Sequence, residues 1–406
     1  MGFDPHNGGN ILVGLDGTAA VTQAGASIVH MDHDLVLGVN AGGSGTYTLG
    51  ARSLTGGNPA NLAIGSDLDI GGFKAATDIY GYDPQTVAAG DTGTLTQNSG
   101  DMLVISSANV GSSGGAGTFN QTGGTMTVDN QLFIGNNGGT GAVVQTGGIT
   151  TVGSVAVDGA LALGTSGGSG SYSITGNSTL IVNGSANIGQ DSSASASSMT
   201  IGNGIGTPVV TIQSQNCNGN LVVGGIDQDN LTFNSGKLTV QGITHVCHFG
   251  TGTVVQNGGS FESGYLDIGI INTNGNSYTL NHGAVIVDND LVIGNFAGSG
   301  GTFRQAGDTV NVNSPDFGVY INNGTYNLQS GNFNVVNIVT VGDVAGGASV
   351  VQGGGGAAIG NTLIFGNSAG TTGLYSQGCS TLIKFLCMPG CDPGRAPRAR
   401  VRSRHW

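Results

Sequence analysis

Residues 117–139 read GTFNQTGGTMTVDNQLFIGNNGG and hold three short runs in which apolar and small polar residues alternate. A period of two places successive side chains on opposite faces of a β-strand, so each run is predicted to have one buried and one solvated face. Gly and Asn are concentrated between the runs, where they supply the positive φ of tight corners. The side chains predicted to point inward are Phe119, Gln121, Met126, Val128, Leu132 and Ile134.

The same frame returns along most of the chain. Starts at Gly93, Gly117 and Gly141 are 24 residues apart, and those at Gly252, Asn276, Gly301 and Gly324 are separated by 24, 25 and 23 residues. About fourteen copies can be recognised. No copy can bury its inner face alone, whereas stacking on the next copy buries it and pairs every strand. We therefore expect an all-β fold: a right-handed parallel β-helix (β-solenoid) with three short strands per coil of about 24 residues.

This repeat sets the expected domain organisation. Residues 1–16 are predicted to form an N-terminal edge or cap, and residues 17–380 the solenoid repeats, interrupted by an irregular insertion at 67–91. A stack of antiparallel hairpins or a β-sandwich is the alternative architecture. The third run, L-x-I-G, returns with one phase at Leu35/Leu37, Leu132/Ile134 and Leu291/Ile293, which favours in-register parallel stacking.

Composition excludes several classes of protein. The 406 residues include 79 Gly but only 8 Pro, and charged residues make up 8%. Collagen needs more Pro and a strict three-residue period, and no apolar stretch is long enough for a membrane helix. Before Lys384 there are four basic and 22 acidic residues, which disfavours nucleic acid as a partner. Only Cys217 and Cys247 lie in the body of the chain, while Cys379, Cys387 and Cys391 lie near its end, and two cysteines are too few for a disulfide framework.

One inward position alternates between Gln and apolar residues. It is Leu49, Ile174, Leu280 or Leu328 in some copies and Gln97, Gln121, Gln145, Gln256, Gln305 or Gln352 in others. Because a buried amide must be hydrogen-bonded, we predict a ladder of stacked amides along the coil axis. A half-exposed Gln at a corner is the alternative interpretation.

The pattern G-T-[FYV]-x-Q-[TN]-G-G-x-[VM]-x-V-x-x-x-L-x-I-G resembles the autotransporter-associated β-strand repeat family of bacterial surface proteins, over most of residues 11–380. The resemblance implies export, a β-helical stalk and structural or adhesive duty at the cell surface. From the residues themselves we expect no catalysis and no cofactor. The expected partners are a host-cell, matrix or glycan ligand, with self-association through the solenoid ends.

The insertion at 67–91 is the sequence candidate for a binding site. It contains Lys74, Tyr80 and Tyr82, and insertions in solenoids commonly form binding loops on one face. Exposed Tyr is a favoured contact for carbohydrate or protein. An irregular coil that merely covers the core is an equal alternative.

Three other groups contain side chains that are common in metal or catalytic sites. His30, Asp32, His33 and Asp34 contain metal-binding side chains, but neighbours in a strand point in opposite directions. By phase, Cys247 and Phe249 take the inward L-x-I places, with His248 outward and His245 nearby, so a Cys–His nucleophile pair is not expected. Stacked acidic corners offer oxygen ligands for Ca²⁺, without the calcium β-roll motif. These corners contain Asp129, Asp158, Asp288 and Asp290.

Two alternative functions stay open from the residues alone. A glycan-active β-helix enzyme would need carboxylates in a groove. An ice-binding solenoid would use outward Thr pairs such as Thr94/Thr96 and Thr125/Thr127, which Ser, Asn, Ala and Asp interrupt elsewhere. Residues 381–406 differ in composition and are expected to be an atypical basic tail, either frameshifted or disordered. The start at Met1 shows no signal peptide, which fits a fragment of a longer surface protein.

Overall fold

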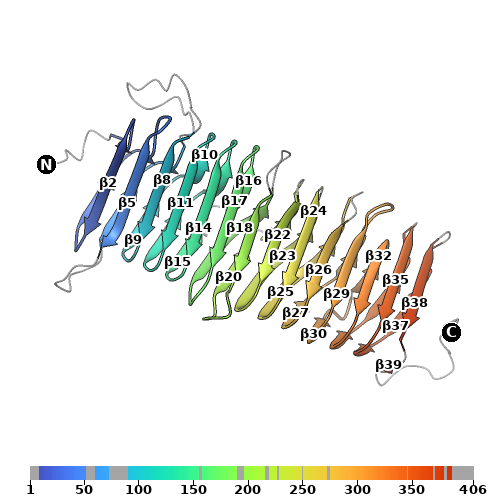
Figure 1. Cartoon of the computed structure of the whole chain (residues 1–406). Helices are drawn as coiled ribbons and strands as arrows, with labels where there is room; N and C mark the ends of the chain where they lie inside the picture. Colours follow the sequence, from blue (N-terminus) through green and yellow to red (C-terminus); the bar gives the residue numbers. More distant parts are fainter. Residues whose placement is uncertain are drawn as a thin grey trace. The chain divides into compact units, whose positions relative to one another are not determined.

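The computed structural model describes residues 9–51, 60–72, 90–154, 158–189, 196–214, 219–225, 228–248, 250–271, 275–344, 346–368, 371–378 and 382–385. Within these residues every regular element is a β-strand. The chain divides into two compact units, unit 1 (Met1–Gly242) and unit 2 (Ile243–Trp406), with the division inside β23 (Lys237–Val246). Figure 1 shows parallel strands stacked coil upon coil within each unit.

Each coil contributes a first, a second and a third run. The first-run strands of unit 1 are β2 (Thr18–Ala24), β5 (Ser44–Ala51), β8 (Thr92–Gln97), β11 (Ala116–Gln121), β14 (Thr140–Gln145), β17 (Ser169–Ile174), β19 (Ser198–Ile201) and β22 (Gln228–Phe233). Its second-run strands are β3 (Ile28–Met31), β6 (Asn61–Ile64), β9 (Asp101–Val104), β12 (Thr125–Val128), β15 (Ile149–Val152) and β20 (Val209–Gln213). Its third-run strands are β1 (Ile11–Val13), β4 (Leu35–Leu37), β7 (Leu68–Ile70), β10 (Ala108–Ser112), β13 (Gln131–Asn136), β16 (Gly159–Thr165) and β21 (Leu221–Val223). In β18 (Thr179–Ile188) the second and third runs form one strand.

Unit 2 repeats the plan. Its first-run strands are β24 (Thr251–Gln256), β26 (Asn276–Leu280), β29 (Gly301–Gln305), β32 (Gly324–Leu328), β35 (Gly347–Gln352) and β38 (Thr372–Gln377). The second run contains β27 (Ala284–Val287), β30 (Thr309–Val312), β33 (Asn332–Val335), β36 (Gly356–Ile359) and β39 (Leu382–Phe385). The third run contains β28 (Leu291–Ile293), β31 (Gly318–Ile321), β34 (Ile338–Val341) and β37 (Thr362–Phe365), and β25 (Ser260–Ile268) combines two runs.

Pairing within each unit confirms the parallel β-solenoid. Gly93, Gly117, Gly141 and Gly170 are partners in successive first-run strands, with no slip in register. Counted over both units, the chain makes about 13 turns of about 25 residues. The antiparallel alternative is therefore wrong for the described strands, because all of their recorded pairings are parallel.

The predicted cap, insertion and tail each contain a strand that pairs with the solenoid. Strand β1 lies within the expected cap at 1–16 and pairs with β4. Leu68–Ile70 of the expected insertion form β7, an ordinary third-run strand between β4 and β10. Strand β39 lies in the expected tail and pairs with β36. The remainder of that tail, and residues 73–89 of the insertion, lie outside the described residues.

The corner after the third run requires glycine. Gly111 has a φ of 71°, and a Cβ there would lie 1.9 Å from the carbonyl oxygen of Thr140. On the other side of the corner, a Cβ on Gly117 would lie 2.2 Å from the backbone nitrogen of Gly111. Two chain segments thus approach each other where only glycine fits, which explains the repeated L-x-I-G and G-T motifs.

The predicted inward side chains form the core. Phe119, Met126, Val128, Leu132 and Ile134 are all buried. In unit 2 the core includes a stack of aromatic rings: Tyr278 and Phe303 have centroids 5.0 Å apart, and Phe303 and Tyr326 5.1 Å, with nearly parallel planes. Offset stacking of this kind adds about 0.5–1.5 kcal/mol per pair beyond area burial.

Burial of the Gln position is confirmed. Among the described residues, the predicted amide ladder is limited to one Gln–Gln hydrogen bond. Gln121 Nε2 donates to Gln97 Oε1 at 3.2 Å. Elsewhere the amide nitrogen donates to corner carbonyls, as from Gln305 to Asp308 and Asn332 at 3.1 and 3.0 Å. The structural reason is that the next coil presents a tyrosine hydroxyl to the amide oxygen in place of a second amide.

This Gln–Tyr pairing was missed from the sequence. Hydroxyls of Tyr47, Tyr172, Tyr278, Tyr326 and Tyr375 donate to Gln23, Gln145, Gln256, Gln305 and Gln352 at 2.5–2.8 Å. A signal was present: where a coil carries Gln, the next often reads Y-x-L or Y-x-I, as at Tyr47–Leu49 and Tyr172–Ile174. Burial raises the pKa of Tyr47 and of Tyr375 to about 12, so these hydroxyls stay protonated donors.

Candidate functional site

The residues predicted to bind a ligand are not described. Lys74, Tyr80 and Tyr82 fall within residues 73–89, outside the described part of the chain. The predicted binding role of this insertion stays a prediction.

The His30–Asp34 segment does not gather its side chains around one point. The side chain of His30 in β3 is exposed, and so are those of Asp32 and His33. Asp34 instead accepts a hydrogen bond from the backbone nitrogen of Asp67 at 2.9 Å. The carboxylate therefore serves a corner of the solenoid.

That use of a polar corner residue is repeated in neighbouring coils. Asn10 Oδ1 accepts from the backbone nitrogen of Asp34 at 3.0 Å, and Asp67 Oδ1 accepts from Ser107 at 2.9 Å. Each side chain thus satisfies a backbone donor of the next coil. Hydrogen bonds to charged acceptors are stronger than neutral ones, so this column stabilises the stacking of coils.

Two of the acidic corners considered for Ca²⁺ have similar structural partners. Asp290 Oδ1 accepts from Gly318 N at 2.9 Å, and Asp158 Oδ1 accepts from Ser214 Oγ at 3.0 Å. Burial raises the pKa of Asp288 and Asp290, with smaller contributions from Glu262 and Asp267 respectively. Among the described residues, no group of three or more His, Cys, Asp or Glu side chains is arranged to hold a metal.

The predicted phase around Cys247 is wrong. Gly269 N donates to Val246 O, and Gly294 N donates to Ile268 O, so Val246 occupies the place that Ile268 has one coil later. The inward L-x-I places therefore belong to Thr244 and Val246. The cause is the ten-residue strand β23, in which alternation passes through the corner without a turn residue.

Cys247 consequently occupies the corner glycine position. Its φ is 72°, close to the 75° of Gly269 at the equivalent place. A non-glycine residue in this region stores strain. The thiol is buried and donates to the carbonyl of Gly250, so it is not presented to a substrate. Phe249 lies outside the described residues.

His245 and His248 lie beside this corner. His245 Nδ1 is 3.5 Å from Asp267 Oδ2, and the two imidazole rings are 5.7 Å apart. Burial and the neighbouring His245 lower the pKa of His248. The group can exchange protons, but the buried thiol gives it no accessible nucleophile.

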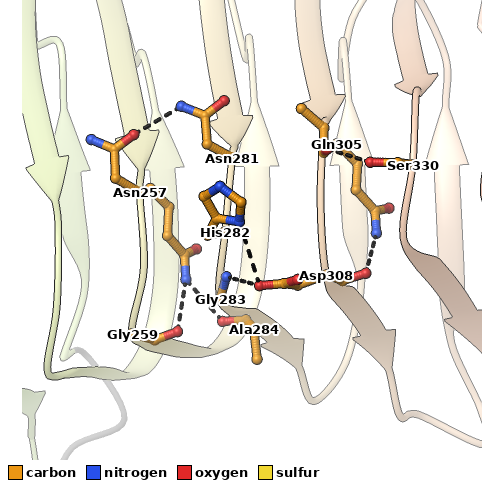
Figure 2. A network of polar contacts seen from close by, with 11 residues as sticks. Asn257, Gly259, Asn281, His282, Gly283, Ala284, Gln305, Asp308 and Ser330 are labelled. Carbon is orange, nitrogen blue, oxygen red and sulfur yellow. Dashed lines mark hydrogen bonds and ion pairs between the residues drawn. The ribbon is translucent and has the colours of Figure 1, made fainter.

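A more exposed polar cluster lies between the first and second runs of unit 2 (Figure 2). We call Asn257, Asn281, His282, Arg304 and Asp308 the polar corner. Asn281 Nδ2 donates to Asn257 Oδ1 at 2.8 Å, and Arg304 Nη1 donates to Asn281 Oδ1 at 3.4 Å. Asp308 Oδ2 accepts from Gly283 N at 2.6 Å and lies 4.0 Å from His282 Nδ1.

The polar corner is built for hydrogen bonding at the surface. The side chains of His282 and Asp308 are 74% and 55% exposed, so solvent screens their attraction. The sequence signal was the Asn that follows the inward position at 256 and 280 in successive coils. Nothing in this cluster combines a nucleophile with a base.

Comparison with known proteins found no matching family model, curated protein or solved structure. Membership of the autotransporter-associated repeat family therefore stays a prediction. Within the described residues, no helix has the length and hydropathy needed to cross a bilayer.

Proposed function

We propose that this chain is a non-catalytic structural and adhesive segment of an extracellular bacterial surface protein. The observation that carries the proposal is the outward face of the first-run strands in unit 1. Thr46, Thr94 and Thr118 are register partners in successive strands β5, β8 and β11. The column continues with Ala142, Ser171, Ser198 and Asn230. We call the outward side chains of these strands the hydroxyl face.

The chemistry of the hydroxyl face suits an uncharged, hydroxyl-rich ligand. A parallel column lies beside the first, with Thr48, Thr96, Asn120, Ser173 and Thr200 among its members. Outward positions of the described first-run strands in unit 1 carry no charged side chain. Neighbouring groups repeat at about 4.8 Å between strands and about 6.6 Å along a strand. Neutral glycan chains can donate to and accept from such an array without desolvating an ion.

The corner carboxylates and the buried thiol support a non-catalytic role. The corner carboxylates of Asp34, Asp67 and Asp290 accept backbone hydrogen bonds from the adjoining coil. The buried thiol of Cys247 faces a carbonyl oxygen. These groups stabilise coil stacking, which is what a structural stalk needs.

Retention of the full chain on insoluble neutral polysaccharides tests the proposal. Thr94→Lys with Thr118→Lys should lower retention at least tenfold, because two ammonium groups would interrupt the hydroxyl face. The matched control is Thr127→Lys with Thr151→Lys, partners on the second-run face of the same unit. Equal retention of both variants, or release of reducing sugar by the unmodified chain, would contradict the proposal.

Ice binding is a second candidate, favoured by the adjacent pairs Thr46/Thr48 and Thr94/Thr96. Ordered hydroxyl pairs on a rigid sheet present regularly spaced hydrogen-bonding groups. Measured thermal hysteresis that Thr94→Lys abolishes would favour ice over glycan. Its absence at millimolar protein would leave adhesion as the function to pursue.

A further inference from the structure

The first-run strands of unit 2 differ from those of unit 1 in one outward side chain. Arg304 in β29 is the only charged residue at the outward positions of the described first-run strands in this unit. Its register partners are Thr279 in the preceding coil and Asn327 in the next. The column beside it contains the hydroxyl groups of Thr253, Ser277, Thr302, Thr325 and Ser349.

Two neutral amide oxygens from neighbouring coils hold the guanidinium group. Arg304 Nη1 donates to Asn281 Oδ1 at 3.4 Å, and Arg304 Nη2 donates to Gln329 Oε1 at 2.6 Å. The amide of Asn281 is itself oriented, because its nitrogen donates to Asn257 Oδ1 at 2.8 Å. The group is therefore fixed by partners from the coils before and after it, and neither partner carries a charge.

The positive charge of Arg304 has no recorded ionic partner. The ion pairs among the described residues of unit 2 are both His–Asp pairs, and neither includes this arginine. Asp308, the carboxylate of the polar corner, accepts from Gly283 N at 2.6 Å and lies 4.0 Å from His282 Nδ1 (Figure 2). A guanidinium group has more N–H donors than the two engaged here, so Arg304 can still bind an anion.

The surroundings of Arg304 define the kind of anion. Guanidinium and carboxylate groups are both planar and form paired, charge-assisted hydrogen bonds. Beside the guanidinium, Thr279, Thr302 and Asn327 provide hydroxyl and amide groups that can bind the hydroxyls of neutral sugars. The net charge of −13 disfavours a long polyanion. The ligand that matches these features is a mainly neutral glycan with an isolated acidic sugar.

We propose that Arg304, oriented by Asn281 and Gln329, binds the carboxylate of a uronic acid within a mainly neutral glycan. The hydroxyl and amide groups around it bind the adjoining neutral sugars. This inference rests on the proposed glycan-binding function, but it concerns unit 2 and a charged sugar, whereas the hydroxyl face of unit 1 is proposed for neutral chains.

Titration of the full chain with a neutral oligosaccharide that ends in one glucuronic acid tests the proposal. The methyl ester of the same oligosaccharide is the matched ligand without a charge, and ligand-observed NMR gives both dissociation constants. The acid should bind at least tenfold more tightly than the ester, because only the acid forms a charge-assisted pair.

Substitutions at Arg304 should change this ratio of affinities. Arg304→Asn should bring the ratio close to one, and asparagine suits the fold because Asn327 occupies the place in the next coil. Arg304→Lys should keep only part of the preference, since an ammonium group lacks the planar fork. The matched control is Lys237→Asn, which removes an exposed positive charge from unit 1 and should leave the ratio unchanged.

Several outcomes would overturn the proposal. They are equal binding of acid and ester, no binding of the acid at millimolar concentration, and a preference that survives Arg304→Asn. A short peptide with one aspartate that binds as tightly as the acid would refute recognition of a sugar. Circular dichroism checks each variant, and Arg304→Lys decides if Arg304→Asn fails to fold. Retention on neutral polysaccharides is tested with unit 1 variants, so either proposal can fail without the other.

Discussion

Gln256 and Asn257 are neighbours in the chain, yet one is buried in the core of unit 2 and the other lies at its surface. Both connect coils through an amide. Gln256 donates to Gly259 and Ala284 and accepts from the hydroxyl of Tyr278, whereas Asn257 accepts from Asn281 (Figure 2). The contacts are alike in kind, but water can replace only the second.

This difference shows which polar contacts hold the solenoid together. A group left unpartnered in the core loses its hydration, while an exposed group exchanges one partner for water. Buried polar groups should therefore dominate stability, although the exposed ladders are equally regular. The same contrast applies to carboxylates, with Asp91 buried and Asp308 at the surface.

The largest change in the free energy of unfolding is expected at the buried carboxylate of Asp91. Its pKa is raised to about 6, from an ordinary value of 3.8, by burial. Between these values the unfolded chain releases its proton first, so the stability of the folded chain should fall as pH rises from about 4 to 6. Asp91→Asn mimics the protonated acid and should remove this dependence, raising stability at pH 7 by about 2 kcal/mol relative to the unmodified chain once the shift is discounted for solvent screening.

Urea unfolding across this pH range measures the effect. Asp308→Asn is the control, because its exposed carboxylate should give no comparable difference. A pH profile that Asp91→Asn does not alter would show that the carboxylate is solvated in the folded chain.

The next largest change in the free energy of unfolding is expected at the buried amide of Gln256. Gln256→Leu should lower the free energy of unfolding by about 2 kcal/mol, because the hydroxyl of Tyr278 would be buried without its acceptor. Leucine fits the place sterically, since Leu280 occupies it in the next coil. Denaturant midpoints at constant m-value provide the measurement. A loss below about 0.5 kcal/mol would mean that the hydroxyl finds another acceptor.

A double substitution should recover about half of that loss. Tyr278→Phe in the Gln256→Leu background removes the orphaned hydroxyl and should restore about 1 kcal/mol, because replacing both partners with apolar groups is nearly neutral. Phe303 and Phe119 already occupy this place in other coils, so the ring is sterically acceptable. A double-mutant cycle by urea unfolding gives the coupling energy, and purely additive losses would refute the pairing.

The repeat made the architecture predictable because a solenoid contact joins residues one coil apart. Alternation located Phe119 and Leu132 in the core, and the spacing of Gly93, Gly117 and Gly141 defined the register. The phase prediction was wrong at Cys247, where β23 continues through a corner that other copies mark with turn residues. Alternation within one strand cannot reveal this shift of phase, because the shift depends on whether the chain bends at the corner.

Side-chain partners were less predictable than strand positions. Gln145 was expected to stack on another amide, but the residue that satisfies it is Tyr172, two positions before its register partner Ile174. The burial of Asp91 was not predictable for a similar reason. Asp91 precedes β8 in the sequence like any turn residue, and only the close approach of Gly115 in the next coil shows that its carboxylate is buried.

The smallest change in the free energy of unfolding is expected at the exposed Asn257–Asn281 hydrogen bond. Asn257→Ala removes the acceptor of Asn281 Nδ2, but water can take its place, and Arg304 still donates to Asn281 Oδ1. The free energy of unfolding should therefore change by less than about 0.5 kcal/mol, as is usual for a surface substitution. Urea unfolding beside Gln256→Leu makes the comparison direct. A loss at Asn257 as large as that at Gln256 would mean that exposed ladders carry coil stacking, and the polar corner would then be a structural clamp.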